Sequence, residues 1–152
     1  MWPFARKSKR FFSEQENEQI VQSIRDAEKS TSGEIRVFVE SKCRFLNALD
    51  RAAEIFISLE MQKTQHRNAV LVYVALKDKQ LALFGDEGIH QKLGDEYWNS
   101  AVQKMIAHFN KNDYASGISQ CVKDVGDALR YHFPYDKSTD KNELPDEIVF
   151  GK

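Results

Sequence analysis

The chain has 152 residues, of which 41% are hydrophobic and 30% charged, a balance typical of one soluble globular domain and not of a disordered or membrane-embedded chain. Lysine and arginine number 22 against 23 aspartate and glutamate residues, so the chain as a whole has no excess positive charge to attract nucleic acid. We therefore expect no nucleic-acid partner.

The N-terminus is basic and aromatic: residues 1–10 contain four basic and two aromatic side chains. No apolar stretch long enough for a signal peptide or a transmembrane segment occurs in the sequence, which favours a cytoplasmic location. We expect residues 1–10 to form a flexible basic N-terminus. A patch of this composition could also touch an anionic membrane surface and make the protein membrane-peripheral.

A helix, a strand and a second helix are predicted at the start of the domain. Ser13 and Glu16 have the spacing of a capping box, and the apolar residues behind them predict a helix over residues 14–29. Residues 34–41 alternate regularly, which predicts a strand with one face better buried than the other. An apolar stripe over residues 49–59 then indicates an amphipathic helix.

Two further strands follow in close succession. The run AVLVYVAL at residues 69–76 is apolar throughout, as in a central strand covered on both faces, and the preceding helix predicts that it runs parallel to the first strand. Only residues 77–79 separate it from a strand at residues 80–84, so these two strands should form an antiparallel hairpin. Helical patterns follow Asp95 and Tyr114.

Together these elements predict an α/β fold, a three-layer α/β/α sandwich with a small mixed sheet, whose first two strands are parallel and are followed by an antiparallel hairpin strand. We expect one domain over residues 11–133 and a polar C-terminal tail over residues 134–152. Four residues of that tail could hold part of it against the domain: Leu144, Ile148, Val149 and Phe150.

The common catalytic motifs are missing from the sequence. It contains no glycine-rich nucleotide loop and no HExxH motif. Cys43 and Cys121 lie far apart with no histidine beside either, which favours structural free thiols over a zinc site. The four histidines are spread through separate elements, where surface positions or helix ends fit better than metal ligation.

Carboxylates are the remaining candidates for chemistry, and the predicted topology gathers several of them. The starts of the parallel strands and the end of the hairpin strand share one sheet edge, where Glu34, Arg67, Asp86 and Glu87 would lie together. Oxygen ligands on loops suit Ca²⁺ or Mg²⁺, so Glu34, Asp86 and Glu87 are our candidate metal ligands and Asp86 our candidate catalytic residue. Arg36 or Arg67 could bind a phosphate.

Two alternatives remain open at this point. Asp86 could cap the following helix, while Glu34 could pair with Arg36 or Arg67. The opposite sheet edge is a second candidate site, because ligands of open α/β sheets usually bind beyond the carboxyl ends of parallel strands. Its candidate metal ligands are Asp50 and Asp78, with Ser41 and Lys42 nearby.

Several short motifs occur in a characteristic order: TSGEIRV at residues 31–37, RNAVLVYVAL at 67–76, GDEGI at 85–89, FP at 133–134 and NELPDEI at 142–148. In this order and spacing they resemble the TPM domain family, whose members are widespread in bacteria and chloroplasts. The resemblance implies an α/β/α sandwich, often with bound divalent cations, and the phosphatase activity attributed to some plant members. It also implies Glu34 and Asp86 as metal ligands.

The sequence departs from the family pattern at two dipeptides. Asn68 and Ala69 stand where Asn-Gly is expected, and Asp78 and Lys79 stand where Asp-Arg is frequent. Lysine cannot bind phosphate in the bidentate manner of arginine, so the second change weakens the case for a phosphate clamp at that position. Bacterial relatives are often encoded near a LemA-type membrane protein, which suggests a partner of that type.

Two hypotheses of different kinds follow. The first is a metal-dependent phosphatase that uses Ca²⁺ or Mg²⁺ and acts on a small phosphate ester or a phosphoprotein. The second is a non-catalytic, cation-binding interaction module that docks on a protein partner and could be accessory to a membrane protein.

Overall fold

The computed structural model describes residues 11–44, 47–135 and 147–151. The predicted helix at residues 14–29 and the strands at 34–41, 69–76 and 80–84 are confirmed to within one residue at each end. In chain order the elements are α2 (Glu14–Glu28), β1 (Glu34–Glu40), α3 (Ala48–Ser58), β2 (Ala69–Ala75), β3 (Gln80–Gly85), α4 (Glu87–Phe109), α5 (Tyr114–His132) and β4 (Val149–Phe150).

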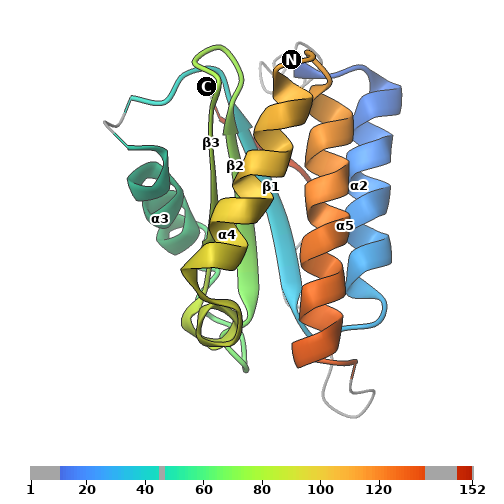
Figure 1. Ribbon diagram of the computed structural model, residues 1–152, viewed down its shortest axis with the longest axis vertical. Coiled ribbons are helices and arrows are strands. Elements are labelled where there is room, and N and C mark those ends of the chain that lie inside the picture. Colours follow the sequence, from blue (N-terminus) through green and yellow to red (C-terminus); the bar gives the residue numbers. More distant parts are fainter. Residues whose placement is uncertain (1–10, 45–46, 136–146, 152) are drawn as a thin grey trace, which may run out of the picture.

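The strands form one mixed sheet in the order β3-β2-β1-β4 (Figure 1). β1 and β2 are parallel, with Glu34 opposite Ala69, and β2 and β3 are antiparallel, with Val70 opposite Gly85. This is the predicted topology. It places β2 inside the sheet, as a strand that is apolar on both faces requires.

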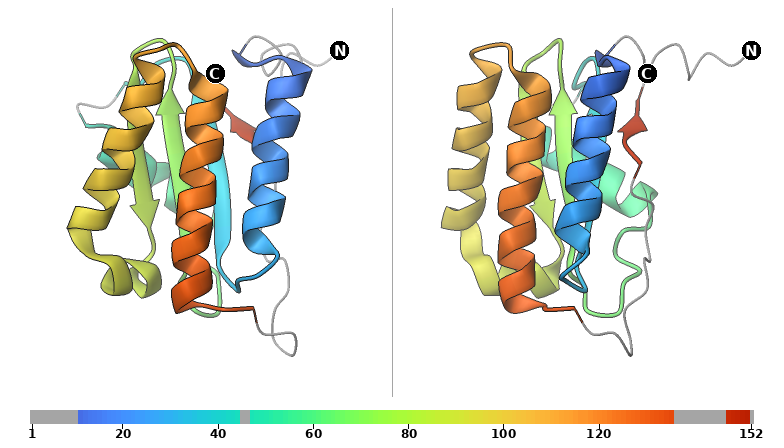
Figure 2. Two further views of the ribbon diagram at one scale, coloured as in Figure 1. Left: turned by 45° about the vertical axis from the view of Figure 1, so that its right-hand side comes forward. Right: turned by 90° about the vertical axis from the view of Figure 1, so that its right-hand side faces the viewer.

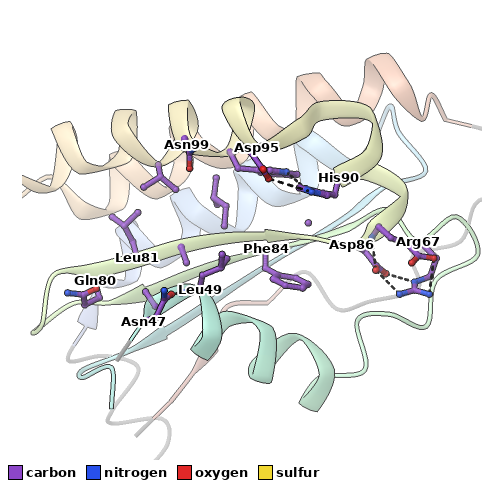
Figure 3. Close-up of a pocket in the computed structure, with 17 residues that line it drawn as sticks. Asn47, Leu49, Arg67, Gln80, Leu81, Phe84, Asp86, His90, Asp95 and Asn99 are labelled. Carbon is purple, nitrogen blue, oxygen red and sulfur yellow. Dashed lines mark hydrogen bonds and ion pairs between the residues drawn. The ribbon is translucent and has the colours of Figure 1, made fainter. Parts of the chain in front are cut away.

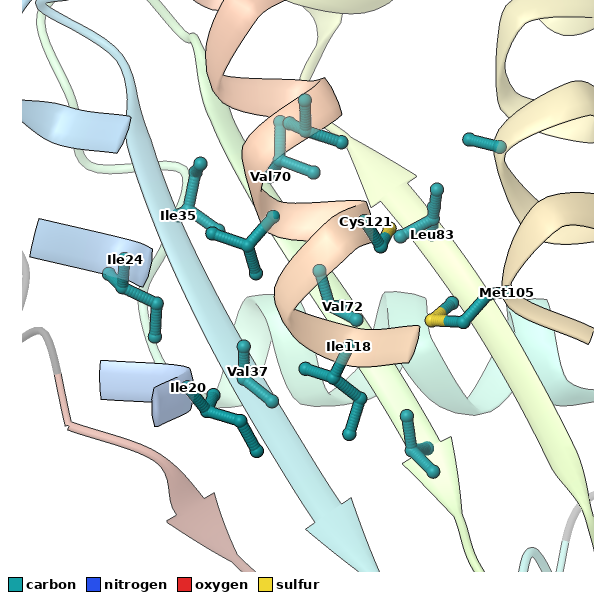
Figure 4. Packing of buried hydrophobic residues seen from close by; sticks show 14 of the residues in the cluster. Ile20, Ile24, Ile35, Val37, Val70, Val72, Leu83, Met105, Ile118 and Cys121 are labelled. Carbon is teal, nitrogen blue, oxygen red and sulfur yellow. The ribbon is translucent and has the colours of Figure 1, made fainter. Parts of the chain in front are cut away.

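Helices cover both faces of the sheet, which confirms the three-layer sandwich. α2, α4 and α5 lie side by side on one face, and α3 lies on the other (Figure 2). The larger core fills the space under the three helices and is mainly aliphatic, with Ile24, Val37, Val72 and Ile118 among its members (Figure 4). No helix in the described ranges combines the length and the apolar character needed to cross a bilayer.

The face of β1 that carries Ile35, Val37 and Val39 is fully buried, as the prediction of one better-buried face requires, but the other face is nearly as well buried. Arg36, Phe38 and Glu40 are only 9%, 8% and 5% exposed. Phe38 and Glu40 are covered by distant parts of the chain. Gly151 lies so close that an added Cβ would be 2.9 Å from carbon atoms of both Phe38 and Glu40, and the Arg51 guanidinium lies 5.9 Å from the Phe38 ring centre.

The C-terminal tail adds a strand that the sequence analysis did not predict. β4 pairs in parallel with the middle of β1. The Phe150 ring stacks on that of Phe11, with 5.6 Å between their centres, and Ile148 packs against the larger core. Leu144 and residues 1–10 lie outside the described residues.

α4 starts earlier than the helical pattern after Asp95 indicated, and it contains a kink. Its first segment begins directly after Asp86 and ends at Gly94, whose φ of 78° and ψ of 170° are not helical. Glycine adopts this conformation at low cost because it has no Cβ. The kink lets two residues on either side of it, His90 and Asp95, approach one another.

Candidate functional site

The topology brings the first set of candidate residues to one edge of the sheet. Glu34 begins β1, and Asp86 directly follows β3. The Glu34 N–H donates to the Asn68 carbonyl at 3.4 Å, and the Asp86 N–H donates to the Ala69 carbonyl at 2.9 Å. The edge expected from the hairpin topology therefore exists, although only some of its side chains meet.

Three residues at this edge, Arg67, Asp86 and Glu87, form an ion-paired group that we call the Arg67 rim; Figure 3 labels Arg67 and Asp86. Arg67 Nε and Nη2 donate to the two Asp86 carboxylate oxygens at 2.7 and 2.8 Å, and Arg67 Nη1 lies 3.4 Å from Glu87 Oε1. Hydrogen bonding to Asp86 raises the pKa of Arg67. The rim contains two negatively charged carboxylates and one positively charged guanidinium, so its net charge is negative.

Asp86 is also the N-cap of α4. Its side chain accepts the Glu87 N–H at 2.8 Å, and the residue is 4% exposed. The carboxylate thus accepts three hydrogen bonds, two from Arg67 and one from the helix. The Asp86 side chain therefore caps α4, as one alternative expected, and also pairs with Arg67.

Glu34 and Arg36 do not belong to the Arg67 rim. Glu34 and Asp86 lie on either side of β2, about two strand spacings or roughly 10 Å apart, and Glu34 is 2% exposed. Arg36 Nε is buried and has no hydrogen bond to a described residue. Burial lowers the Arg36 pKa, and the negative charges of Glu147 and Glu28 offset part of this effect. Arg67 is therefore the arginine of this edge that a ligand can reach, since its side chain is 42% exposed.

The second candidate edge holds residues with structural contacts of their own. Asp78 Oδ2 accepts the Cys43 N–H at 2.9 Å, which ties the loop after β1 to the hairpin. Asp50 is exposed in the first turn of α3, where the helix dipole favours a carboxylate, and Lys42 is exposed. The Ser41 carbonyl accepts the Lys77 N–H at 2.8 Å. No described contact joins Asp50 to Asp78.

The sequence analysis did not predict a buried polar group that lies near this second edge. The Arg51 guanidinium donates to both Glu40 carboxylate oxygens at 2.9 Å, and the Tyr73 hydroxyl donates to Glu40 Oε2 at 2.5 Å. Burial, and then the contact with Glu40, raises the Tyr73 pKa. The sequence carried no signal for this group, because Glu40 falls on the strand face that was expected to be less buried.

A groove of about 900 Å³ runs along β3 from the Arg67 rim toward the hairpin, between α3 and α4 (Figure 3). On the α4 side, the Trp98 indole N–H donates to His90 Nδ1 at 3.0 Å, and His90 Nε2 lies 3.6 Å from Asp95 Oδ1. The sequence analysis expected surface or helix-end positions for the histidines, and His90 is exposed in the first turn of α4. A glycine inside a helical pattern, Gly94, was the signal that the chain bends here.

The oxygen chemistry of the Arg67 rim fits a hard cation, although it offers few ligands. Among residues 11–44, 47–135 and 147–151, no group of three or more His, Cys, Asp or Glu side chains is arranged to hold a metal ion. Asp86 and Glu87 supply two carboxylates. Mg²⁺ is commonly held by one or two carboxylates together with water and substrate phosphate, whereas Ca²⁺ takes more oxygen ligands. Two carboxylates would hold Mg²⁺ only together with water or a phosphate, and they are too few for a Ca²⁺ site built from protein alone.

The fold and this edge define a three-layer α/β/α domain with a charged rim at the start of its parallel strands. Residues 6–128 match the TPM domain, and the chain belongs to that family. No match is found among the curated proteins.

Three solved structures show the same architecture. The NMR structure of BA42 from the psychrophilic bacterium Bizionia argentinensis is 38% identical, with a TM-score of 0.85 over 93% of this chain and 96% of that one. The N-terminal domain of a P. gingivalis protein is 21% identical, with a TM-score of 0.66 and 82% of each chain covered. The N-terminal domain of cg2496 from Corynebacterium glutamicum is 14% identical, with a TM-score of 0.62 over 88% of this chain and 80% of that one. The last two support the fold alone.

Proposed function

We propose that the Arg67 rim binds a phosphate ester together with a divalent cation, Mg²⁺ in preference to Ca²⁺, and that this TPM domain hydrolyses the ester. The observation that carries the proposal is the contact of Arg67 with Asp86 and Glu87 at the open end of the groove. An arginine that is already oriented for bidentate contact with a carboxylate can bind phosphate oxygens in the same way.

The residues of the rim have distinct roles in this proposal. A phosphate competes with Asp86 for the Nε–H and Nη2–H donors of Arg67, so phosphate binding frees an Asp86 oxygen to accept a proton from water. That water attacks phosphorus as Asp86 takes its proton, the bond between phosphorus and the ester oxygen breaks, and the leaving oxygen takes up the proton held by Asp86, so the products are the alcohol and inorganic phosphate and Asp86 is again a carboxylate. Asp86 and Glu87 would hold the cation, which when bound polarises the phosphoryl oxygens.

The test is hydrolysis of 4-nitrophenyl phosphate by the full chain, with added Mg²⁺, with added Ca²⁺ and with EDTA. We expect turnover that needs a cation, falls on the order of a hundredfold in Asp86→Asn, as for loss of a general base, and falls clearly in Arg67→Gln. Asp50→Asn and Asp78→Asn at the opposite edge are matched controls and should keep full activity. Absence of turnover with either ion, or equal loss in the controls, would reject the proposal.

A second function, a non-catalytic binding module, is favoured by one specific observation. The Asp86 carboxylate already accepts three hydrogen bonds, as expected of a structural ion pair and helix cap. Under this proposal the rim binds a cation and the domain docks on a protein, such as a membrane protein of the LemA type. Calorimetry with Mg²⁺, with and without inorganic phosphate, separates the two: heat of binding without turnover of any phosphate ester supports the module.

A further inference from the structure

β3 is an edge strand without the features that usually protect such strands. It is the first strand in the order β3-β2-β1-β4, and no described strand lies beyond it. Natural edge strands are commonly blunted by charged residues, proline or bulges. The sequence of β3, QLALFG, contains no charge and no proline, and its pairing with β2 is continuous from Gln80 to Gly85.

The backbone groups that β3 directs outward can be identified from the pairing. Asp86 lies opposite Ala69, and its N–H donates to the Ala69 carbonyl. In an antiparallel pair every second residue bonds to the neighbouring strand, so this bond shows which residues of β3 bond to β2. Gln80, Ala82 and Phe84 therefore bond to β2. Residues 81, 83 and 85 direct their N–H and C=O groups away from β2, and no turn or loop bond of the described backbone uses them.

The groove leaves room for a strand at this edge. α4 forms one wall with Trp98 and Val102, and the start of α3 forms the other with Leu49, whose side chain is 49% exposed. Figure 3 shows Leu81 directed from β3 toward α4 and Phe84 directed toward α3, on opposite faces of the strand. A strand next to β3, about 4.8 Å away, would direct alternate side chains toward the two walls.

The charges of the groove restrict its occupant. Three carboxylates line it, those of Asp86, Glu87 and Asp95. Beside them are Arg67, which is paired to Asp86 and Glu87, and His90, whose Nε2 lies 3.6 Å from Asp95 Oδ1. We propose that β3 binds an extended polypeptide segment as an additional strand, and that this segment carries apolar side chains at alternate positions and a lysine or arginine near Asp95 or Glu87. Backbone pairing supplies affinity in this mode, while the walls and acidic residues supply specificity.

The proposal goes beyond the phosphate and cation function and needs neither ligand, so it is tested in EDTA. The probe is a random heptapeptide library displayed on phage and selected against the immobilised full chain. The selected peptides are then synthesised with a fluorescein label for anisotropy measurements. We expect enrichment of alternating apolar sequences that contain lysine or arginine.

Amide hydrogen exchange of the full chain with bound peptide tests the position of the new strand. The amides of residues 81, 83 and 85 should gain protection, while those of Gln80, Ala82 and Phe84, already bonded within the sheet, should change little. Leu81→Pro removes one outward donor and should weaken peptide binding by about tenfold. Leu81→Ala keeps that donor and loses similar side-chain packing, so it is the matched control and should weaken binding less than about threefold.

Three results would overturn the proposal. They are no enrichment of any peptide, protection of amides outside β3, and equal effects of the two Leu81 variants. Sedimentation that shows a dimer, with protection of the same amides in the absence of peptide, would also overturn it by identifying a second copy of the chain as the occupant. The exchange measurement uses the wild-type chain, so a misfolded Leu81→Pro variant does not prevent the test.

Discussion

Arg67 binds both carboxylate oxygens of Asp86 while the same carboxylate caps α4, so one side chain links the loop before β2 to the helix after β3. The backbone strengthens this link, because the Gly88 N–H donates to the Arg67 carbonyl at 2.8 Å. Any ligand that competes for Arg67 therefore acts on the start of α4 as well.

Two substitutions separate the capping role of Asp86 from its charge. Asn is a good N-cap, so Asp86→Asn should keep the cap and lose the ion pair, whereas Asp86→Ala should lose both. We expect the free energy of unfolding of Asp86→Ala to be about 1 kcal/mol lower than that of Asp86→Asn, which is the usual contribution of a cap. Urea unfolding of both variants measures the difference. Equal stability of the two would show that the cap contributes little.

The close approach at Gly88 predicts a site that tolerates no side chain. A Cβ there would lie 2.2 Å from the His66 carbonyl oxygen and 2.6 Å from that of Arg67, and backbone atoms cannot move aside cheaply. Gly88→Ala should lower the free energy of unfolding by about 1–3 kcal/mol, as overpacking usually does.

Gly94 provides the contrasting case, because an added Cβ would meet nothing within 4 Å and only the φ of 78° opposes a side chain. Gly94→Ala and Gly94→Asn should each lower the free energy of unfolding by about 1–3 kcal/mol, because a φ of 78° with a ψ of 170° is a conformation essentially restricted to glycine and lies outside the left-handed helical region that asparagine tolerates. Urea unfolding of the three variants tests both statements. A Gly88→Ala protein as stable as the wild type would contradict the contact at the start of α4.

The elements of the fold were predictable from the sequence because each depends on local patterns: a capping box at Ser13, a continuous apolar run in β2, and a break too short for anything but a hairpin. The contacts between side chains were less predictable, because they depend on covering segments that are distant in the sequence and on the backbone angles of single residues. Phe38 is covered by Arg51 and Gly151, which are distant in the sequence, and His90 meets Asp95 because Gly94 bends α4. Topology correctly indicated which edge holds Arg67 and Asp86, but not that Glu34 would be buried away from them.

The Glu40 group predicts a strong dependence of stability on Arg51. The Glu40 side chain is 6% exposed, so Arg51→Met leaves a buried carboxylate without its cation and should lower the free energy of unfolding by about 3 kcal/mol. Tyr73→Phe removes one hydrogen bond to a charged group and should cost about 1.5 kcal/mol or more.

A double-mutant cycle tests this explanation of the Glu40 group. Glu40→Gln should be less damaging in the Arg51→Met protein than in the wild type, because it neutralises the unpaired charge. Arg130→Met, which removes an exposed pair with Asp127, is the matched control and should have little effect. Additive effects of the Glu40 and Arg51 substitutions would contradict the assigned coupling.

The last prediction concerns the pH dependence of stability that arises from Cys121. The thiol is buried in α5, and burial, with a further contribution from Asp124, raises its pKa from 9.0 to about 12. Between these values the unfolded chain loses the thiol proton while the folded protein keeps it, so unfolding becomes easier as the pH rises. The loss is at most about 1.4 kcal/mol per pH unit, is absent below pH 9, and is complete once the pH passes the folded pKa.

Cys121→Val replaces the thiol with a group that does not titrate and has a similar volume, so its free energy of unfolding should fall less between pH 8 and pH 10.5 than that of the wild type. Tyr73 is common to both proteins, whereas the pKa of Tyr97 is raised by burial and also by Cys121, so the difference between the two urea-unfolding series measures the thiol together with its effect on Tyr97. Parallel loss of stability in the two proteins would mean that Cys121 ionises as readily in the folded state as in the unfolded chain.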